Sequence, residues 1–126
     1  MYLIDTDIII WILRGRQDII ELIFRIIGKR ESAISTITIA EVYQHIFPKE
    51  IPIAEKTFSL YEIYPVSAGI ARSGGLYWQE YHKKLHKLSI ADCLIAATAN
   101  EYNLSLLTLN TRHFPMKDIK VMNPLD

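Results

Sequence analysis

The chain has 126 residues, half of them hydrophobic, and its 14 basic side chains balance 14 acidic ones. We predict one domain over residues 1–126, because a chain of this length buries about two thirds of its unfolded surface without disulfides or structural metal. The formal net charge of zero excludes a global field that would attract nucleic acid or membranes, so any affinity for a polyanion has to be local.

Cellular location can be predicted from what the sequence lacks. Cys93 is the only cysteine, so no internal disulfide can form, and this is compatible with a reducing cytoplasm. Residues 1–7 reach an acidic position early and do not resemble a secretory signal. The apolar runs at 8–13 and 19–27 are too short or too charged to cross a membrane. We expect a cytoplasmic protein with no membrane association.

Five short apolar segments have the length and composition of strands. They are residues 2–4, 33–35, 62–66, 105–108 and 119–122. Apolar side chains recur with helical spacing over 19–27, where Gly28 stands at the expected helix end, and over 89–102. Strands that alternate with helices favour a parallel sheet covered on both faces, which predicts the α/β class.

A long helix is also predicted over residues 67–85, but Gly74 and Gly75 interrupt it. Each glycine inside a helix costs about 1 kcal/mol relative to alanine. We therefore expect either a bend or close packing against a neighbour at this point.

Four polar side chains follow the predicted strands or begin the helices after them. Asp5 directly follows the first strand, Glu41 is placed at the start of the helix after the second, Asp92 opens the 89–102 helix, and Asn110 follows the fourth strand. Ligands of open parallel sheets bind in the crevice beyond the carboxyl ends of the strands. These four positions are therefore predicted to meet at one rim of the sheet.

Helix capping is the alternative interpretation of these acids. Thr38 and Glu41 have the spacing of a capping box, and so do Ser89 and Asp92. Asp5 can be read as a turn or as the cap of the first helix. Capping and catalysis are compatible, because an acid in the first turn is held rigidly near the positive end of the helix.

The chemistry of the acids indicates a metal site. Crowded carboxylates repel one another unless a cation lies between them. Oxygen ligands without histidine or cysteine suit Mg²⁺ or Mn²⁺ better than zinc. Such an ion can activate a water molecule toward a phosphodiester and offset charge on the leaving oxygen.

These motifs together resemble the PIN-domain nucleases, and in particular the VapC-type toxins of prokaryotic toxin–antitoxin pairs. Residues 3–7 (LIDTD) resemble the opening strand of that family with its first aspartate, and residues 36–41 (TITIAE) resemble its second acidic motif. The strongest likeness lies in residues 89–99 (SIADCLIAATA) and 107–114 (LTLNTRHF). The motifs occur in order and span nearly the whole chain.

The resemblance implies a three-layer α/β/α PIN-like fold with a central parallel sheet of about five strands. It further implies an endoribonuclease that uses Mg²⁺ or Mn²⁺ and a metal-activated water to hydrolyse RNA, and that acts as the toxin of a type II toxin–antitoxin pair. A homodimer and a cognate antitoxin would be its partners. Asp5 and Asp92 would be the principal metal ligands, Glu41 a further ligand or water-positioning group, and Thr6 would bind near the scissile phosphate.

Position 110 departs from the family pattern, since many family nucleases have aspartate where this chain has Asn110. An amide can orient water or contact a metal but carries no charge, so a second ion would be held less tightly. Asp7 is a candidate for partial compensation. The departure keeps a second interpretation open, namely a catalytically weak or inactive PIN-like binding module. A phosphoacceptor signalling domain fits less well, because such a site needs adjacent acids after the first strand.

Three further features of the sequence are candidates for contact with RNA or an antitoxin. Arg112 and His113 lie next to Asn110, where they suit such contact, although a surface turn explains them equally. Trp11 and the isoleucine-rich segment 19–27 offer surplus apolar surface, which suggests a groove for an amphipathic antitoxin helix or ordinary burial. A basic run before the Asp92 helix suits either RNA phosphates or a solvated helix end; it comprises His82, Lys83, Lys84, His86 and Lys87.

Overall fold

The protein is described here by a computed structural model, which covers residues 1–27 and 32–126. Its central sheet has five parallel strands in the order β3-β2-β1-β4-β5. The strands are β1 (Tyr2–Ile4), β2 (Ser32–Ser35), β3 (Glu62–Tyr64), β4 (Ser105–Leu107) and β5 (Val121–Met122). The predicted α/β class and the parallel sheet of about five strands are confirmed.

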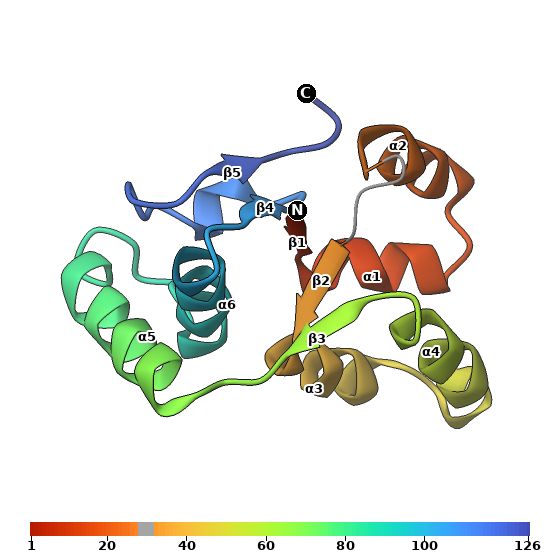
Figure 1. Ribbon diagram of the computed structural model, residues 1–126, viewed down its shortest axis with the longest axis horizontal. Coiled ribbons are helices and arrows are strands. Elements are labelled where there is room, and N and C mark those ends of the chain that lie inside the picture. The colour runs from red at the N-terminus through yellow and green to blue at the C-terminus, as the bar shows by residue number, and fades with distance from the viewer. Residues whose placement is uncertain (28–31) are drawn as a thin grey trace.

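Helices cover both faces of the sheet, with α5 and α6 on one side and α1, α2 and α4 on the other (Figure 1). The helices are α1 (Thr6–Leu13), α2 (Gln17–Ile27), α3 (Thr36–His45), α4 (Ile51–Phe58), α5 (Ala68–Tyr81) and α6 (Ile90–Glu101), with short 3₁₀ turns η1 (Pro48–Glu50) and η2 (Thr111–His113). In the described ranges, no helix is both long and apolar enough to span a bilayer.

The strands supply two hydrophobic cores because successive side chains of a strand point to opposite faces. Leu3, Ala33 and Leu106 pack with α5 and α6. Their neighbours Ile4, Ile34 and Leu107 pack with α1, α2 and α4. Burial on both faces explains why these strands read as continuous apolar runs in the sequence.

Several element boundaries differ from those predicted. Strands β3 and β5 are shorter than the predicted 62–66 and 119–122, because each lies at an edge of the sheet and has only one neighbour to pair with. The helix predicted over 67–85 ends at Tyr81. The helix end expected at Gly28 falls outside the described residues.

Gly74 and Gly75 do not interrupt α5, and Gly74 serves close packing. Helix α5 runs without a break from Ala68 to Tyr81 and packs along α6. A Cβ atom at Gly74 would lie 2.7 Å from Cδ2 of Leu94, closer than real Cβ contacts, whereas one at Gly75 would meet nothing. Gly74 thus lets α6 lie directly against α5.

The order of the strands determines where a ligand can bind. The chain passes from β1 to β2 and β3 on one side, and later places β4 and β5 on the other side of β1. In doubly wound sheets the ligand crevice opens at the carboxyl ends of the strands that flank such a reversal. Here those strands are β1 and β4, which are directly followed by Asp5 and Thr108.

Candidate active site

Asp5 is the first residue after β1 and caps the N-terminus of α1. Its Oδ1 accepts a hydrogen bond from the backbone N–H of Thr6 at 2.8 Å, and its Oδ2 accepts one from Oγ1 of Thr108 at 2.7 Å. The side chain is almost fully buried, with 6% exposed. The capping interpretation is therefore confirmed for Asp5. The same hydrogen bonds hold its carboxylate at the carboxyl end of β1, where the strand order reverses.

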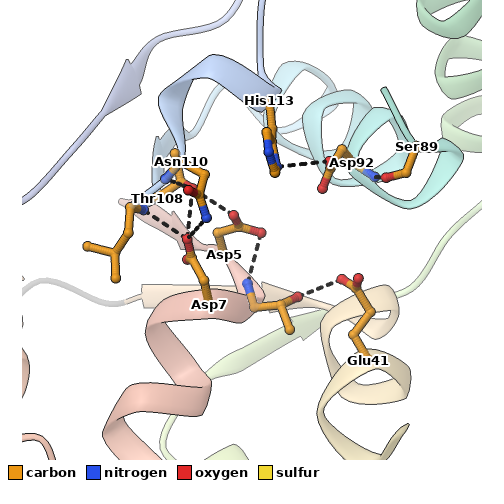
Figure 2. Close-up of polar contacts among 10 residues, drawn as sticks. Asp5, Asp7, Glu41, Ser89, Asp92, Thr108, Asn110 and His113 are labelled. Atoms are coloured by element: carbon orange, nitrogen blue, oxygen red, sulfur yellow. Dashed lines mark hydrogen bonds and ion pairs between the residues drawn. The ribbon is translucent and has the colours of Figure 1, made fainter. Parts of the chain in front are cut away.

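Asp7 lies beside Asp5 and contacts the chain that leaves β4 (Figure 2). Its Oδ1 accepts a hydrogen bond from the N–H of Ile8 at 2.7 Å. Its Oδ2 accepts hydrogen bonds from the N–H of Leu109 at 3.1 Å and from Nδ2 of Asn110 at 3.0 Å. Asp7 thus ties the first turn of α1 to the end of β4.

Glu41 lies in the second turn of α3, not at its start as predicted. Ser35 caps this helix, and its Oγ accepts from the N–H of Ile37 at 3.0 Å. The predicted capping box of Thr38 and Glu41 is wrong because the helix begins immediately after β2, where Ser35 already supplies a cap. Glu41 is therefore free of a capping role.

A chain of hydroxyl groups holds the Glu41 carboxylate. Its Oε1 lies 2.7 Å from Oγ1 of Thr6, which lies 3.1 Å from Oγ1 of the buried Thr38. Thr6 donates its single hydroxyl proton to Glu41, so the contact between Thr6 and Thr38 is made with Thr38 as the donor. The hydroxyl of Thr6 therefore lies between the hydroxyl of Thr38 and the carboxylate of Glu41.

Asp92 stands in the first turn of α6, as predicted. Ser89 is the N-cap of this helix, and its Oγ accepts from the N–H of Asp92 at 3.0 Å. Oδ2 of Asp92 lies 3.6 Å from Nδ1 of His113 in η2. Figure 2 shows this pair facing the side chains that follow β1 and β4. Asp92 is thus fixed by its helix and faces a histidine from a separate segment.

The electrostatics of the aspartates disfavour their full ionisation. Burial raises the pKa of Asp5 to about 7, with the charge of Asp7 as the second cause and hydrogen bonds from Thr108 and Thr6 opposing it. Burial also raises the pKa of Asp7 and of Asp92. The hydrogen bond from Ser89 and the charge of His113 partly offset this effect at Asp92. A positive charge at this place would relieve the repulsion.

We call Asp5, Asp7, Glu41 and Asp92 the acidic rim, and its donor set fits a hard divalent cation. The oxygens of these carboxylates are the ligands that Mg²⁺ and Mn²⁺ prefer. As the side chains stand, no three acidic, histidine or cysteine groups of residues 1–27 and 32–126 converge closely enough to hold an ion. Ion binding would therefore require the carboxylates to turn toward one another.

The structure places the predicted site residues Asp5, Glu41, Asp92 and Asn110 around one region (Figure 2). Thr6 contacts Glu41 there. Arg112 lies on the exposed turn η2, beside His113. Sequence reasoning missed Thr108, which is buried and bonded to Asp5, and it did not foresee the contacts of Asp7. The predicted strand 105–108 included Thr108, and a polar residue at the end of this apolar run was the available signal.

Comparison with known proteins agrees with this fold. A family model described as "PIN domain" matches residues 2–120. The chain belongs to the PIN domain family. The expected resemblance is therefore confirmed across nearly the whole chain.

Two relatives from Mycobacterium tuberculosis are similar over most of their length. Ribonuclease VapC19 is 36% identical over 117 residues, which cover 92% of this chain and 94% of the relative. Ribonuclease VapC10 is 31% identical over 116 residues, which cover 92% of this chain and 87% of the relative. Both relatives carry the name of a ribonuclease.

Solved structures show the same architecture. A toxin–antitoxin complex from Klebsiella pneumoniae contains a chain that is 30% identical, with a TM-score of 0.74 and 98% of both chains covered. FitAcB from Neisseria gonorrhoeae is 26% identical, with a TM-score of 0.78 and 99% of both chains covered. VapBC-1 from nontypeable Haemophilus influenzae is 21% identical with a TM-score of 0.83, covers 99% of this chain and 98% of that chain, and supports the fold alone.

Proposed function

We propose that this protein is a divalent-metal-dependent endoribonuclease that acts as the toxin of a toxin–antitoxin pair. The observation that carries the proposal is the gathering of the acidic rim at the switch point between β1 and β4, where burial raises the pKa values of three aspartates. Family membership and the ribonuclease relatives support it. We further propose a cytoplasmic, single-domain protein.

In this proposal Asp5, Asp92 and Glu41 hold Mg²⁺ or Mn²⁺. The cation, when bound, favours ionisation of a water molecule and offsets negative charge on the RNA phosphodiester. The backbones of Asp5 and Asp92 are fixed at the starts of α1 and α6, so only their carboxylates would have to turn toward the cation. Glu41, on the longer side chain, is a further ligand or orients the attacking water.

Two residues around the rim are proposed to bind RNA. The hydroxyl of Thr6 lies at the rim, where it donates to Glu41, and it would donate to a phosphate oxygen once the Glu41 carboxylate turns to the cation. Arg112 on the exposed turn η2 supplies a positive charge for the RNA backbone. Asn110, which donates from Nδ2 to Asp7, is proposed to contribute its amide to the site.

We propose that the antitoxin contacts a hydrophobic depression on the other side of the molecule, which we call the apolar groove. It has a volume of about 410 Å³ and is lined by Ile12, Ile20, Ile23, Phe24, Ile27, Ser32, Thr57, Leu60 and Tyr61. The expected groove along the isoleucine-rich helix is therefore present. Trp11 does not line it, and instead has the guanidinium of Arg16 5.0 Å from its ring centre.

The occupant proposed for the apolar groove is an amphipathic helix of the antitoxin. Phe24 and Leu60 are 69% and 73% exposed, and such large apolar side chains side by side mark binding surfaces. Solved relatives described as toxin–antitoxin complexes support a partner of this kind. The homodimer implied by the family resemblance remains part of the proposal, and sedimentation of the purified toxin tests it.

The test of the activity is cleavage of RNA by purified protein with and without Mg²⁺. Asp5→Asn combined with Asp92→Asn is expected to abolish cleavage while circular dichroism shows a folded protein. Asp18→Asn is the matched control, because this exposed aspartate on α2 lies outside the acidic rim. Undiminished cleavage by the double variant would remove the proposal.

The second candidate is a PIN-like binding module without catalysis. Two observations favour it. Position 110 is an amide, and in the described part of the chain no three acidic, histidine or cysteine side chains lie close enough together to hold an ion. Titration with Mn²⁺ separates the two functions. Binding of Mn²⁺ that depends on Asp5 and Asp92 supports the nuclease, whereas no binding supports the module.

A further inference from the structure

Asp7 was expected only to compensate for the missing charge at position 110, and its contacts indicate a different role. Both lone pairs of its Oδ2 are occupied, by the N–H of Leu109 at 3.1 Å and by Nδ2 of Asn110 at 3.0 Å. Its Oδ1 accepts from the N–H of Ile8 at 2.7 Å. Oδ2 of Asp7 is therefore committed to protein donors before any ligand binds, and Oδ1 already accepts one hydrogen bond.

The contact with Asp7 determines which way the Asn110 amide points. A carboxylate that already accepts two other N–H groups acts as an acceptor, so the end of the amide that faces it is Nδ2 and not Oδ1. The carbonyl oxygen Oδ1 is then left as a neutral oxygen that can accept from water or bind a cation. Asp7 therefore selects one of the two orientations of Asn110.

Thr108 extends the effect of Asp7 to Asp5. Oγ1 of Thr108 accepts the N–H of Asn110 at 3.0 Å and donates to Oδ2 of Asp5 at 2.7 Å. Its distance to Oδ2 of Asp7 is 3.4 Å, so its single proton belongs to the shorter contact with Asp5. The segment 108–110, held at Leu109 and Asn110 by Asp7, in turn holds Asp5.

We propose that Asp7 is a positioning residue of the metal site, which acts through Asn110 and Thr108 by the geometry of its hydrogen bonds and not by supplying the charge absent from position 110. The inference rests on the metal-dependent function proposed above. Partners that orient metal ligands typically contribute about 10–100-fold to metal affinity or activity.

Variants that keep the charge but change the geometry separate the two roles. Asp7→Glu retains the carboxylate but moves it by one methylene. Asp7→Asn combined with Asn110→Asp restores the charge of the site, but the new amide at position 7 then offers an N–H₂ group where the N–H of Leu109 needs an acceptor. Charge compensation predicts nearly wild-type Mn²⁺ affinity for both. Positioning predicts that both bind Mn²⁺ about tenfold more weakly or worse.

The measurements are the Kd for Mn²⁺ by calorimetry, kcat and KM for RNA cleavage, and the Tm of metal-free protein. We expect kcat to fall at least about tenfold while KM changes by less than about twofold, since the RNA contacts proposed above do not involve Asp7. Asp18→Asn and Asn100→Asp are matched controls, because both positions are exposed and lie outside the site.

Thr108→Val is a second, charge-neutral variant that keeps the test informative if changes at Asp7 prevent folding. It removes the hydroxyl between Asn110 and Asp5 in a nearly isosteric way, and the same loss of Mn²⁺ affinity is expected. Wild-type Mn²⁺ affinity in Thr108→Val, in Asp7→Glu or in the charge-restored double variant overturns this inference alone. A wild-type protein that neither binds Mn²⁺ nor cleaves RNA overturns the proposed function and this inference with it.

Discussion

The acidic rim and the apolar groove are both unfavourable for an isolated folded chain, but for opposite reasons. The rim buries carboxylates of like charge, whereas the groove leaves large apolar side chains in water. Burial of charge and exposure of apolar surface each cost stability. The two regions therefore indicate two different ligands, a cation for the rim and an apolar partner for the groove.

The regions also differ in how their side chains are held. Hydrogen bonds from named backbone and hydroxyl donors hold three of the rim carboxylates, those of Asp5, Asp7 and Glu41. The apolar side chains of the groove, such as Ile23 and Phe24, carry no hydrogen-bonding groups and are held by packing. We expect conservative single substitutions to act strongly at the rim, whereas the groove should respond mainly to substitutions that introduce charge.

The largest effect should be the pH dependence of the metal-free protein. Burial raises the pKa of Asp5 from 3.8 to about 7, so the folded state holds this proton more tightly than the unfolded state. The stability that protonated Asp5 contributes is fully present below about pH 4 and is lost as pH rises to 7, a change of roughly 4 kcal/mol. Urea unfolding with a chelator at about pH 4.5 and pH 8 measures it.

Asp5→Asn is the control for this titration, because an amide does not ionise. The variant should lose less stability than the wild type over the same pH range, and added Mg²⁺ should stabilise only the wild type. Equal pH profiles for the two proteins would show that Asp5 is not the titrating group. They would contradict the statement that burial of the Asp5 carboxylate destabilises the metal-free rim.

Glu41→Gln should have the next largest effect, about a 100-fold loss in kcat, or about 2.7 kcal/mol. The amide keeps the size of the side chain and can still accept from Thr6, but it lacks the charge that binds a cation. Steady-state cleavage of a labelled RNA measures the loss. Glu101→Gln, on the exposed end of α6, is the matched control and should cleave like the wild type.

Phe24→Asp in the apolar groove should weaken antitoxin binding by tenfold or more, about 1.4 kcal/mol, and leave RNA cleavage by the free toxin unchanged. Phe24 is 69% exposed, so the fold tolerates the charge while the partner loses an apolar contact. Calorimetry with the cognate antitoxin measures the affinity. Arg25→Asp tests the exposed neighbouring position; an equal loss there would mean that charge, and not the groove, controls binding.

Ser89→Ala should have the smallest effect. The substitution removes the cap that accepts the N–H of Asp92 and should cost about 1 kcal/mol of stability. Metal affinity should fall by less than about threefold, because Asp92 remains in the first turn of α6. A large loss of Mn²⁺ binding would show that the cap positions Asp92 directly, and Ser89 would then count as a positioning residue of the metal site.

The amino-acid pattern alone was sufficient to predict the helices and strands whose burial is strong and regular. Helix α6 and strand β1 were predicted with nearly correct bounds, because their apolar spacing reports directly which side chains face the core. No bounds were predicted for helix α4: it is short, and Pro48 and Pro52 indicated a turn between helices where the helix already begins at Ile51. The start of α3 was misplaced because two suitable caps, Ser35 and Thr38, compete within four residues.

Local pattern also identified the acids that follow the strands, because each such position depends only on where its own strand ends. Their contacts depended on the order of the strands. Asp7 meets Asn110, 103 positions along the chain, only because β4 pairs directly with β1. Strand order results from how both faces of the sheet are buried by helices, which is a property of the whole chain and is encoded by no single segment.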